Sequence, residues 1–240
     1  RGRLHRNGPG RRKAERPHHN TCGELADQAL HHGRAWCPVF QICFCCFDDL
    51  CFLYIFVCFL CDLCMLRFTD NVWVDLSMFY LSHRGIIEAM IEAHQRGAVL
   101  RVLLDPSEDA FGKKKNGIPN RQVAMELHEV GIPIRWCDTH GEQCHSKLML
   151  TRPNNAPAEL LLGSANFTRR NLDDLNLETN VVLIGDVSEP VFADVITFFE
   201  LQWNNGPNQF FSQPYEYYAD ESRWRYWRYR IMEATGLSTF

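Results

Sequence analysis

The chain has 240 residues, with 25 basic and 29 acidic side chains, a formal charge of −4 and 46% hydrophobic residues. That length suits one α/β domain, alone or with a smaller appendage, and the hydrophobic content excludes a wholly disordered chain. The mild acidity excludes a globally basic nucleic-acid-binding protein, although it is compatible with a local basic groove.

The N-terminal region, residues 1–34, carries eight basic and three acidic residues, and its first twenty are rich in Arg, Gly and Pro. It has no apolar period, which is typical of a disordered basic tail. Such a tail could contact phosphate or an anionic membrane surface, but a solvated tail or a sequence artefact is the simpler interpretation. We therefore predict that residues 1–34 lie outside the core.

Residues 35–70 form a Cys-rich apolar segment that holds eight of the eleven cysteines. Cys43 and Cys46 form one C-x-x-C pair, and Cys61 and Cys64 another, but the polar, Gly-containing turns of a zinc knuckle are missing. We therefore favour an apolar segment over a zinc site.

The longest apolar run of this segment, Leu50–Cys61, would cover about 18 Å as a helix, short of the roughly 30 Å hydrocarbon core of a bilayer. Membrane insertion is therefore an alternative and not our first expectation. The segment shares no pattern with the residues after it, so a stretch foreign to the domain is a further alternative.

Patterns of regular structure extend from about residue 71 to residue 203. Short runs rich in β-branched, Leu and aromatic residues predict strands at Val72–Tyr80, Ala98–Leu104, Ile132–Trp136, Ser146–Thr151, Glu159–Leu162 and Thr179–Ile184. Helices are predicted after a cap at Ser82, from Pro119 to Glu129, and from Ser188 and Pro190 to about Trp203. Residues 105–118 read as a polar loop whose lysine run is solvated. This alternation predicts a layered α/β domain.

The C-terminal residues 204–240 are rich in aromatic side chains and include the run WRYWRYR. Interleaved Arg and aromatic residues can stack on bases or lie at a membrane interface. We expect this extension to pack on the domain, because aromatic residues at the end of a small domain usually cover its hydrophobic face.

Two short motifs carry the chemistry. His145 and Lys147 are two positions apart on a predicted strand, so they point to the same face and offer a proton carrier beside a positive charge. Ser164 and Asn166 follow the apolar strand Glu159–Leu162, where α/β sheets tend to bind ligands. These four side chains together suit a phosphoryl group. Cys144, next to His145, is interpreted as a small packing residue.

The motifs resemble those of the phospholipase D superfamily, whose pattern is H-x-K-x4-D-x6-G-S-x-N, often followed by N-x-E. His145-x-Lys147, Gly163-Ser164-x-Asn166 and Asn176-x-Glu178 match it. Residues 71–203 are similar to bacterial phospholipase-D-like and cardiolipin-synthase-like proteins. The resemblance implies an α/β layered sandwich, with a mixed sheet flanked by helices, as one half-domain copy.

The chain departs from this pattern in two places. The Asp of the motif would fall at position 152, which is Arg152, and Glu178, Asp173 or Asp174 could supply the carboxylate instead. The family also combines two HxK motifs in one active site, whereas this chain has one. The resemblance therefore implies that activity requires a homodimer that brings two copies of His145 together, or an N-terminal half outside this sequence.

The reaction that the resemblance implies is phosphodiester hydrolysis or transphosphatidylation on phospholipids through a phosphohistidine, without a cofactor or metal ion. The catalytic residues would be His145, Lys147, Ser164, Asn166 and Glu178. One alternative is a homodimeric endonuclease, which the negative charge of the core disfavours. Another is an inactive half-domain that binds anionic phosphate groups. A cytoplasmic or membrane-associated location is expected, with a membrane surface as a partner.

Overall fold

The computed structural model describes residues 42–44, 53–56, 72–107, 109–110, 113–114, 120–173 and 175–235. The predicted basic tail, residues 1–34, lies outside these described residues, as does most of the Cys-rich segment. All described elements belong to one compact unit, Cys37–Phe240.

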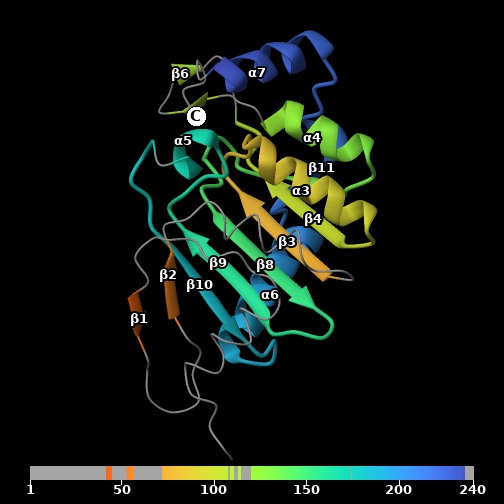
Figure 1. The fold of residues 1–240 in the computed structure, drawn as a ribbon. Coiled ribbons are helices and arrows are strands. Elements are labelled where there is room, and N and C mark those ends of the chain that lie inside the picture. Colours follow the sequence, from red (N-terminus) through yellow and green to blue (C-terminus); the bar gives the residue numbers. More distant parts are fainter. Residues whose placement is uncertain are drawn as a thin grey trace, which may run out of the picture. The chain divides into compact units, whose positions relative to one another are not determined.

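A mixed β-sheet is the centre of this unit (Figure 1). Among the described residues it has nine strands, in the order β1-β2-β10-β9-β8-β3-β4-β7-β11. Their bounds are β1 Ile42–Phe44, β2 Leu53–Phe56, β3 Val72–Met78, β4 Val99–Leu104, β7 Ile134–Cys137, β8 Lys147–Pro153, β9 Ala158–Gly163, β10 Asn180–Gly185 and β11 Ser212–Pro214. The pairs β3–β4 and β4–β7 are parallel, and the others are antiparallel.

Helices cover both faces of the sheet (Figure 1). Helices α3, Arg84–Gln95, and α4, Asn120–Glu129, lie on one face, and α6, Pro190–Asn204, lies on the other. Side chains of β3 alternate accordingly: Val72, Val74, Leu76 and Met78 join the core beneath α3 and α4. A second core contains Phe192 and Phe199 of α6 together with Leu148, Leu150 and Leu160 of the sheet. The predicted layered sandwich, a mixed sheet flanked by helices, is therefore confirmed.

The start of α3 differs from the prediction. The N-cap is His83, without a side-chain cap, and the hydroxyl of Ser82 has no hydrogen-bond partner among the described residues. The backbone N–H groups of Ser82 and His83 both donate to the carbonyl of Phe167, at 2.7 and 2.8 Å. Because this contact holds residues 82–83 in extended structure, the helix begins later and the predicted Ser82 cap is wrong.

The predicted polar loop contains a small hairpin, β5 at Asp109–Ala110 with β6 at Lys113–Lys114. The Cys-rich segment also contributes to the sheet, since β2 lies inside the long apolar run and pairs antiparallel with β10. No helix in the described part of the chain is long and apolar enough to span a membrane.

The C-terminal extension adds three elements after α6, none of them predicted individually. They are β11, the 3-10 turn η1 at Tyr215–Tyr217, and helix α7 at Arg223–Thr235. Tyr215 and Tyr229 are buried in the core beneath α3 and α4, whereas Trp224 and Trp227 are 75% and 60% exposed.

Candidate active site

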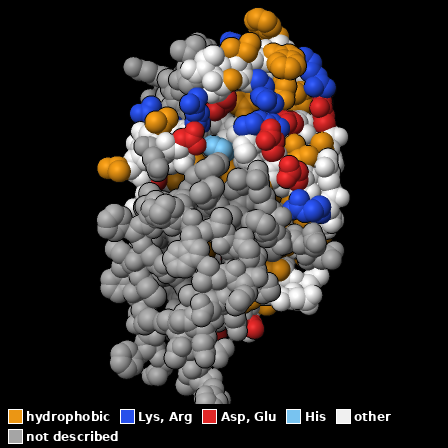
Figure 2. All heavy atoms as spheres, viewed as in Figure 1, with side chains coloured by type: hydrophobic (Ala, Val, Ile, Leu, Met, Phe, Trp, Pro, Cys, Tyr) orange, Lys and Arg blue, Asp and Glu red, His pale blue; other side chains and the backbone are white. Residues whose placement is uncertain are grey.

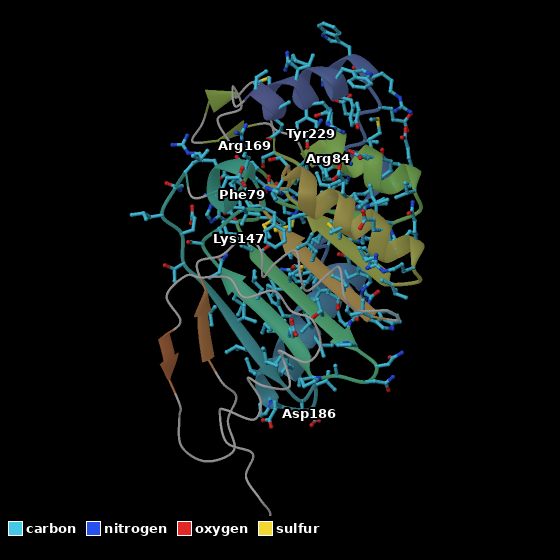
Figure 3. All side chains as sticks on the ribbon, in the orientation of Figure 1. Phe79, Arg84, Lys147, Arg169, Asp186 and Tyr229 are labelled. Carbon is cyan, nitrogen blue, oxygen red and sulfur yellow. A yellow bond between two sulfur atoms is a disulfide. The ribbon has the colours of Figure 1, made fainter. Side chains whose placement is uncertain are left out.

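The two sequence motifs meet at one end of the sheet. Helix α5, Arg169–Leu172, lies just beyond the second motif. In the β8–β9 pair Leu148 faces Leu162, so the start of β8 lies beside the end of β9. Asn180 at the start of β10 faces Gly163, which brings the segment before β10 to the same edge. Figure 3 shows Phe79 and Lys147 at this end, with Arg169 nearby and Asp186 at the opposite end. The fold therefore assembles His145, Lys147, Ser164, Asn166 and Glu178 from three adjacent strand ends.

Lys147 lies directly against His145. Its Nζ is 3.2 Å from His145 Nδ1, 3.4 Å from Nε2 and 3.2 Å from the His145 carbonyl oxygen. Lys147 is 7% exposed, and burial lowers its pKa to about 8. The aromatic ring of Phe79 packs against the imidazole, at 4.5 Å between centroids, and lies 5.1 Å from Nζ.

The surroundings of His145 favour the neutral form of its imidazole. Partial burial lowers its pKa below the ordinary value, and the charge of Lys147 lowers it further, while Asp105 acts in the opposite direction. At neutral pH the ring is therefore mostly neutral, and its unprotonated nitrogen faces the Lys147 ammonium. A neutral imidazole beside a buried cation suits attack on the phosphorus of a bound anion.

Asp105 fixes the loop that carries His145. Its carboxylate accepts the backbone N–H of Cys144 at 2.5 Å and that of Ser107 at 2.8 Å. Asp105 is fully buried, and burial raises its pKa. Asn120 extends this support, because its amide donates to the carbonyls of Phe79 and Asp105 at 2.6 and 2.9 Å.

Sequence reasoning missed both supporting residues. For Asp105, its position in the sequence was a usable signal. It directly follows a buried parallel strand, and functional side chains gather at such strand ends in α/β sheets. Asn120 gave no such signal, since a polar residue at the start of a helix is usually read as a cap.

Ser164 and Glu178 form the other side of the site. The hydroxyl of Ser164 donates to Glu178 Oε2 and accepts the backbone N–H of Thr179 at 3.0 Å. Glu178 Oε1 accepts from the amides of Asn171 and Asn176, the latter at 2.6 Å. Glu178 also opposes the lowering of the Lys147 pKa, so its charge acts on the site.

Asn166 and Gly163 complete the second motif. Asn166 Oδ1 accepts the backbone N–H of Tyr80 at 3.2 Å, which ties the motif to the end of β3. A side chain at Gly163 would collide with Asn180 Oδ1 and would lie 2.5 Å from the Thr179 carbonyl oxygen. Glycine is therefore required here by the close approach of β10.

Arg152, which stands where the motif's Asp is expected, lies away from His145 at the far end of β8. It pairs with the buried carboxylate of Asp75, which also binds Arg101 at 2.7 Å. Asp173, one of the expected substitutes, instead contacts His83 Nε2 at 3.3 Å, and Asp174 lies outside the described residues. The described carboxylate that acts on the His145 loop is Asp105.

Cys144 is bonded to Cys137, so its interpretation as a simple packing residue is wrong. The disulfide joins the end of β7 to the residue before His145 and closes a short loop. Within the described ranges no group of three or more His, Cys, Asp or Glu side chains could hold a metal ion.

In a comparison with known protein families, residues 71–203 match the family model described as "Cardiolipin synthase, PLD-like domain". No curated protein matches the chain. The phospholipase D family member Nuc from Salmonella typhimurium is 18% identical, over 61% of this chain and 86% of its own, with a TM-score of 0.49.

Two further solved structures are similar. The phosphatidylserine synthase of Haemophilus influenzae is 12% identical, with a TM-score of 0.51, over 79% of this chain and 46% of its own. This chain thus spans about half of that enzyme. NucT from Helicobacter pylori is 14% identical, over 60% of this chain and 86% of its own, with a TM-score of 0.42.

Proposed function

Since the chain belongs to the cardiolipin-synthase-type, phospholipase D-like family, we propose that it cleaves or exchanges phosphodiester bonds, with phospholipids as its substrates. This proposal rests mainly on the contact between His145 and Lys147, whose Nδ1 and Nζ atoms are 3.2 Å apart. The lowered pKa of His145 favours its neutral form, and the same end of the sheet bears Ser164 and Glu178.

In the proposed first step an imidazole nitrogen of His145 attacks phosphorus, and the bond from phosphorus to the leaving alcohol breaks. A second histidine gives its proton to the departing oxygen. Lys147 lies where it can stabilise the negative charge that gathers on the non-bridging oxygens, with the NH₂ group of Asn166 as a second donor. Ser164, whose hydroxyl donates to Glu178, would hold that carboxylate in the site.

In the second step water or an alcohol attacks the phosphohistidine, and the bond from phosphorus to nitrogen breaks. The second histidine, now neutral, removes the proton of the attacking group, so both histidines return to their starting states. Water as the acceptor gives hydrolysis, and the hydroxyl of a lipid gives transphosphatidylation.

A second copy of the chain is proposed to supply the second histidine. His145 lies on an exposed edge, where a partner can approach it. The segment that carries Glu178 also presents Leu175 and Leu177, which are 63% and 99% exposed, beside the site. Apolar side chains at the rim of a half-site are suited to an interface with another chain.

The test is hydrolysis of bis-p-nitrophenyl phosphate, phosphatidylglycerol vesicles and single-stranded DNA, with EDTA present and protein concentration varied. We expect lipid turnover that rises faster than linearly with concentration, because a dimer-built site is populated by mass action. The variant His145→Ala should abolish turnover. His140→Asn is the matched control, because His140 lies on an exposed turn with a φ of 45°, which Asn tolerates.

Each contrary result has a definite meaning. Preferential cleavage of DNA would replace the lipid substrate with a nuclease function. Absence of turnover from a folded, dimeric chain would overturn the enzyme proposal and leave a half-domain that binds phosphate groups.

A further inference from the structure

Helix α7 presents an apolar stripe to solvent. Trp224, Trp227 and Ile231 are 75%, 60% and 60% exposed. Their spacing of three and four residues places them on one face of the helix. Figure 2 shows hydrophobic side chains gathered over α7, with Lys and Arg side chains beside them. A helix normally turns such a stripe toward the core, so the outward direction requires an explanation.

The opposite face of the same helix already holds it to the domain. Tyr229 is 3% exposed, and its hydroxyl donates to the carbonyl of Ser82 at 3.0 Å. Tyr226 donates to Glu126 at 3.4 Å. Because these tyrosines anchor the helix, the outward stripe is not needed to keep α7 in place.

Arginines flank the stripe on both sides. Residues 223–235 contain four arginines, namely Arg223, Arg225, Arg228 and Arg230, and one acidic residue, Glu233. Arg223 meets Glu129 in an exposed ion pair at 2.5 Å, and Arg225 meets the mostly buried Asp220 at 2.8 Å. An exposed pair such as Arg223–Glu129 contributes little to stability. The surface of α7 is therefore apolar along its centre and cationic along its edges, on a chain whose formal charge is −4.

We propose that this face of α7 docks the protein onto an anionic phospholipid bilayer. Tryptophan is favoured at the boundary between headgroups and acyl chains, and a helix with an apolar face edged by cations lies in that plane. Each arginine near the surface adds attraction to anionic lipids. The helix lies beyond residues 71–203, so the docking surface is separate from the part of the chain that the family model covers.

Two other occupants fit the face less well. Single-stranded nucleic acid would stack on the tryptophans, but Ile231 within the same stripe offers no stacking surface. A second copy of α7 across a two-fold axis would bring two sets of four arginines together, and like charges across an interface are unfavourable.

The position of α7 places the bilayer near the candidate active site. Arg169 of α5, three residues after Asn166, donates through Nη1 to the carbonyl of Glu233 at 3.2 Å. The hydroxyl of Tyr229 reaches the residue before the α3 N-cap. Docking would therefore occur at the same end of the sheet as the two motifs (Figure 1). The proposal concerns binding alone and does not depend on turnover.

The test is co-sedimentation of the full chain with vesicles of phosphatidylglycerol mixed with phosphatidylcholine, compared with vesicles of phosphatidylcholine alone. We expect binding to the anionic vesicles that weakens with salt. The double variant Trp224→Ser with Trp227→Ser should bind at least about tenfold more weakly. The double variant Arg225→Gln with Arg228→Gln should bind roughly tenfold more weakly and lose about half of the salt dependence, because two of the four arginines remain.

Matched controls are Phe198→Ser and Arg96→Gln. Phe198 is 46% exposed on α6, across the sheet, and Arg96 ends α3 about 18 Å from its N-terminus. Both variants should bind vesicles as the unchanged chain does, and circular dichroism should show all variants folded.

Three results would overturn the proposal. The first is unchanged vesicle binding by the tryptophan double variant. The second is a dimer that dissociates on that substitution, because it would assign the face to a second copy. The third is retention of single-stranded DNA, without retention of vesicles, through the same tryptophans.

Discussion

Replacement of Asp105 by Asn tests how the loop that carries His145, the proposed nucleophile, is held in place. The carboxylate of Asp105 accepts two backbone N–H groups, one from Ser107 within its own turn and one from Cys144 next to His145. An amide has one oxygen, and its NH₂ group would face at least one of these donors. The variant therefore keeps the shape of the residue and removes one acceptor and the negative charge.

The loss of folding free energy in Asp105→Asn depends on how deeply Asp105 is buried. Asp105 is fully buried, so water does not replace the lost acceptor. A buried donor left without a partner costs about 1–3 kcal/mol. The charge of Asp105 also raises the pKa of His145 against the effects of burial and Lys147. Without that charge the pKa of His145 falls further, so the acid limb of kcat/KM should move to lower pH.

The assays are urea unfolding and the pH profile of kcat/KM. Asp186→Asn is the matched control: Asp186 accepts the N–H of Ser188, also two residues ahead, but on an exposed turn at the other end of the sheet (Figure 3). Its stability and acid limb should match those of the unchanged chain. If Asp105→Asn unfolds at the same urea concentration and keeps its acid limb, Asp105 does not position the His145 loop.

Three further predictions concern the rest of the site. Lys147 is charged below its pKa of about 8, so activity should fall as pH rises through that value, and Lys147→Arg should move this basic limb upward in a pH–rate profile. Glu178→Gln removes the charged acceptor of the Ser164 hydroxyl and should lower kcat/KM about tenfold; an unchanged value would remove Glu178 from the site. Replacing Cys137 and Cys144 by Ser opens a disulfide that spans seven positions and should lower the free energy of unfolding by about 2.5 kcal/mol, measured in urea without reductant; equal stability of the two forms would contradict a stabilising crosslink.

The layered fold could be predicted because its signals are local. Strands such as Val99–Leu104 are short, apolar and bounded by Gly97 and Asp105, and the helices between them have stops of their own. The order of the strands could not be read in this way. Only the paired backbone places β10 beyond β9 and β11 beside β7, and β11 is too short and polar to stand out in the sequence.

The motif residues were predictable because two residues that are two positions apart on a strand lie on the same face of the sheet. His145 and Lys147 meet as a two-residue repeat requires. Their supporting contacts were harder to predict. Asp105 had only its place after a buried strand as a signal, since it bonds Cys144 across 39 positions, and Asn120 acts through Asp105 and had no signal. The Cys137–Cys144 bond escaped detection for a similar reason: eleven cysteines allow many pairings, and most lie in another segment.

The direction of the α7 tryptophans shows where composition alone misleads. Aromatic residues near a terminus usually pack, and Tyr229 does, while Trp224 on the same helix points to solvent. The face that a residue occupies on a helix depends on which neighbours anchor that helix, and here the tyrosines do so.

The proposed mechanism requires His145 to carry the phosphoryl group during turnover. The most direct test is to quench the protein under alkaline conditions during turnover of a phosphatidyl substrate and to locate the added group by mass spectrometry. We expect an acid-labile adduct on His145 that forms in EDTA and is absent from His145→Ala. Turnover without an adduct on His145, or with one on another residue, would contradict it.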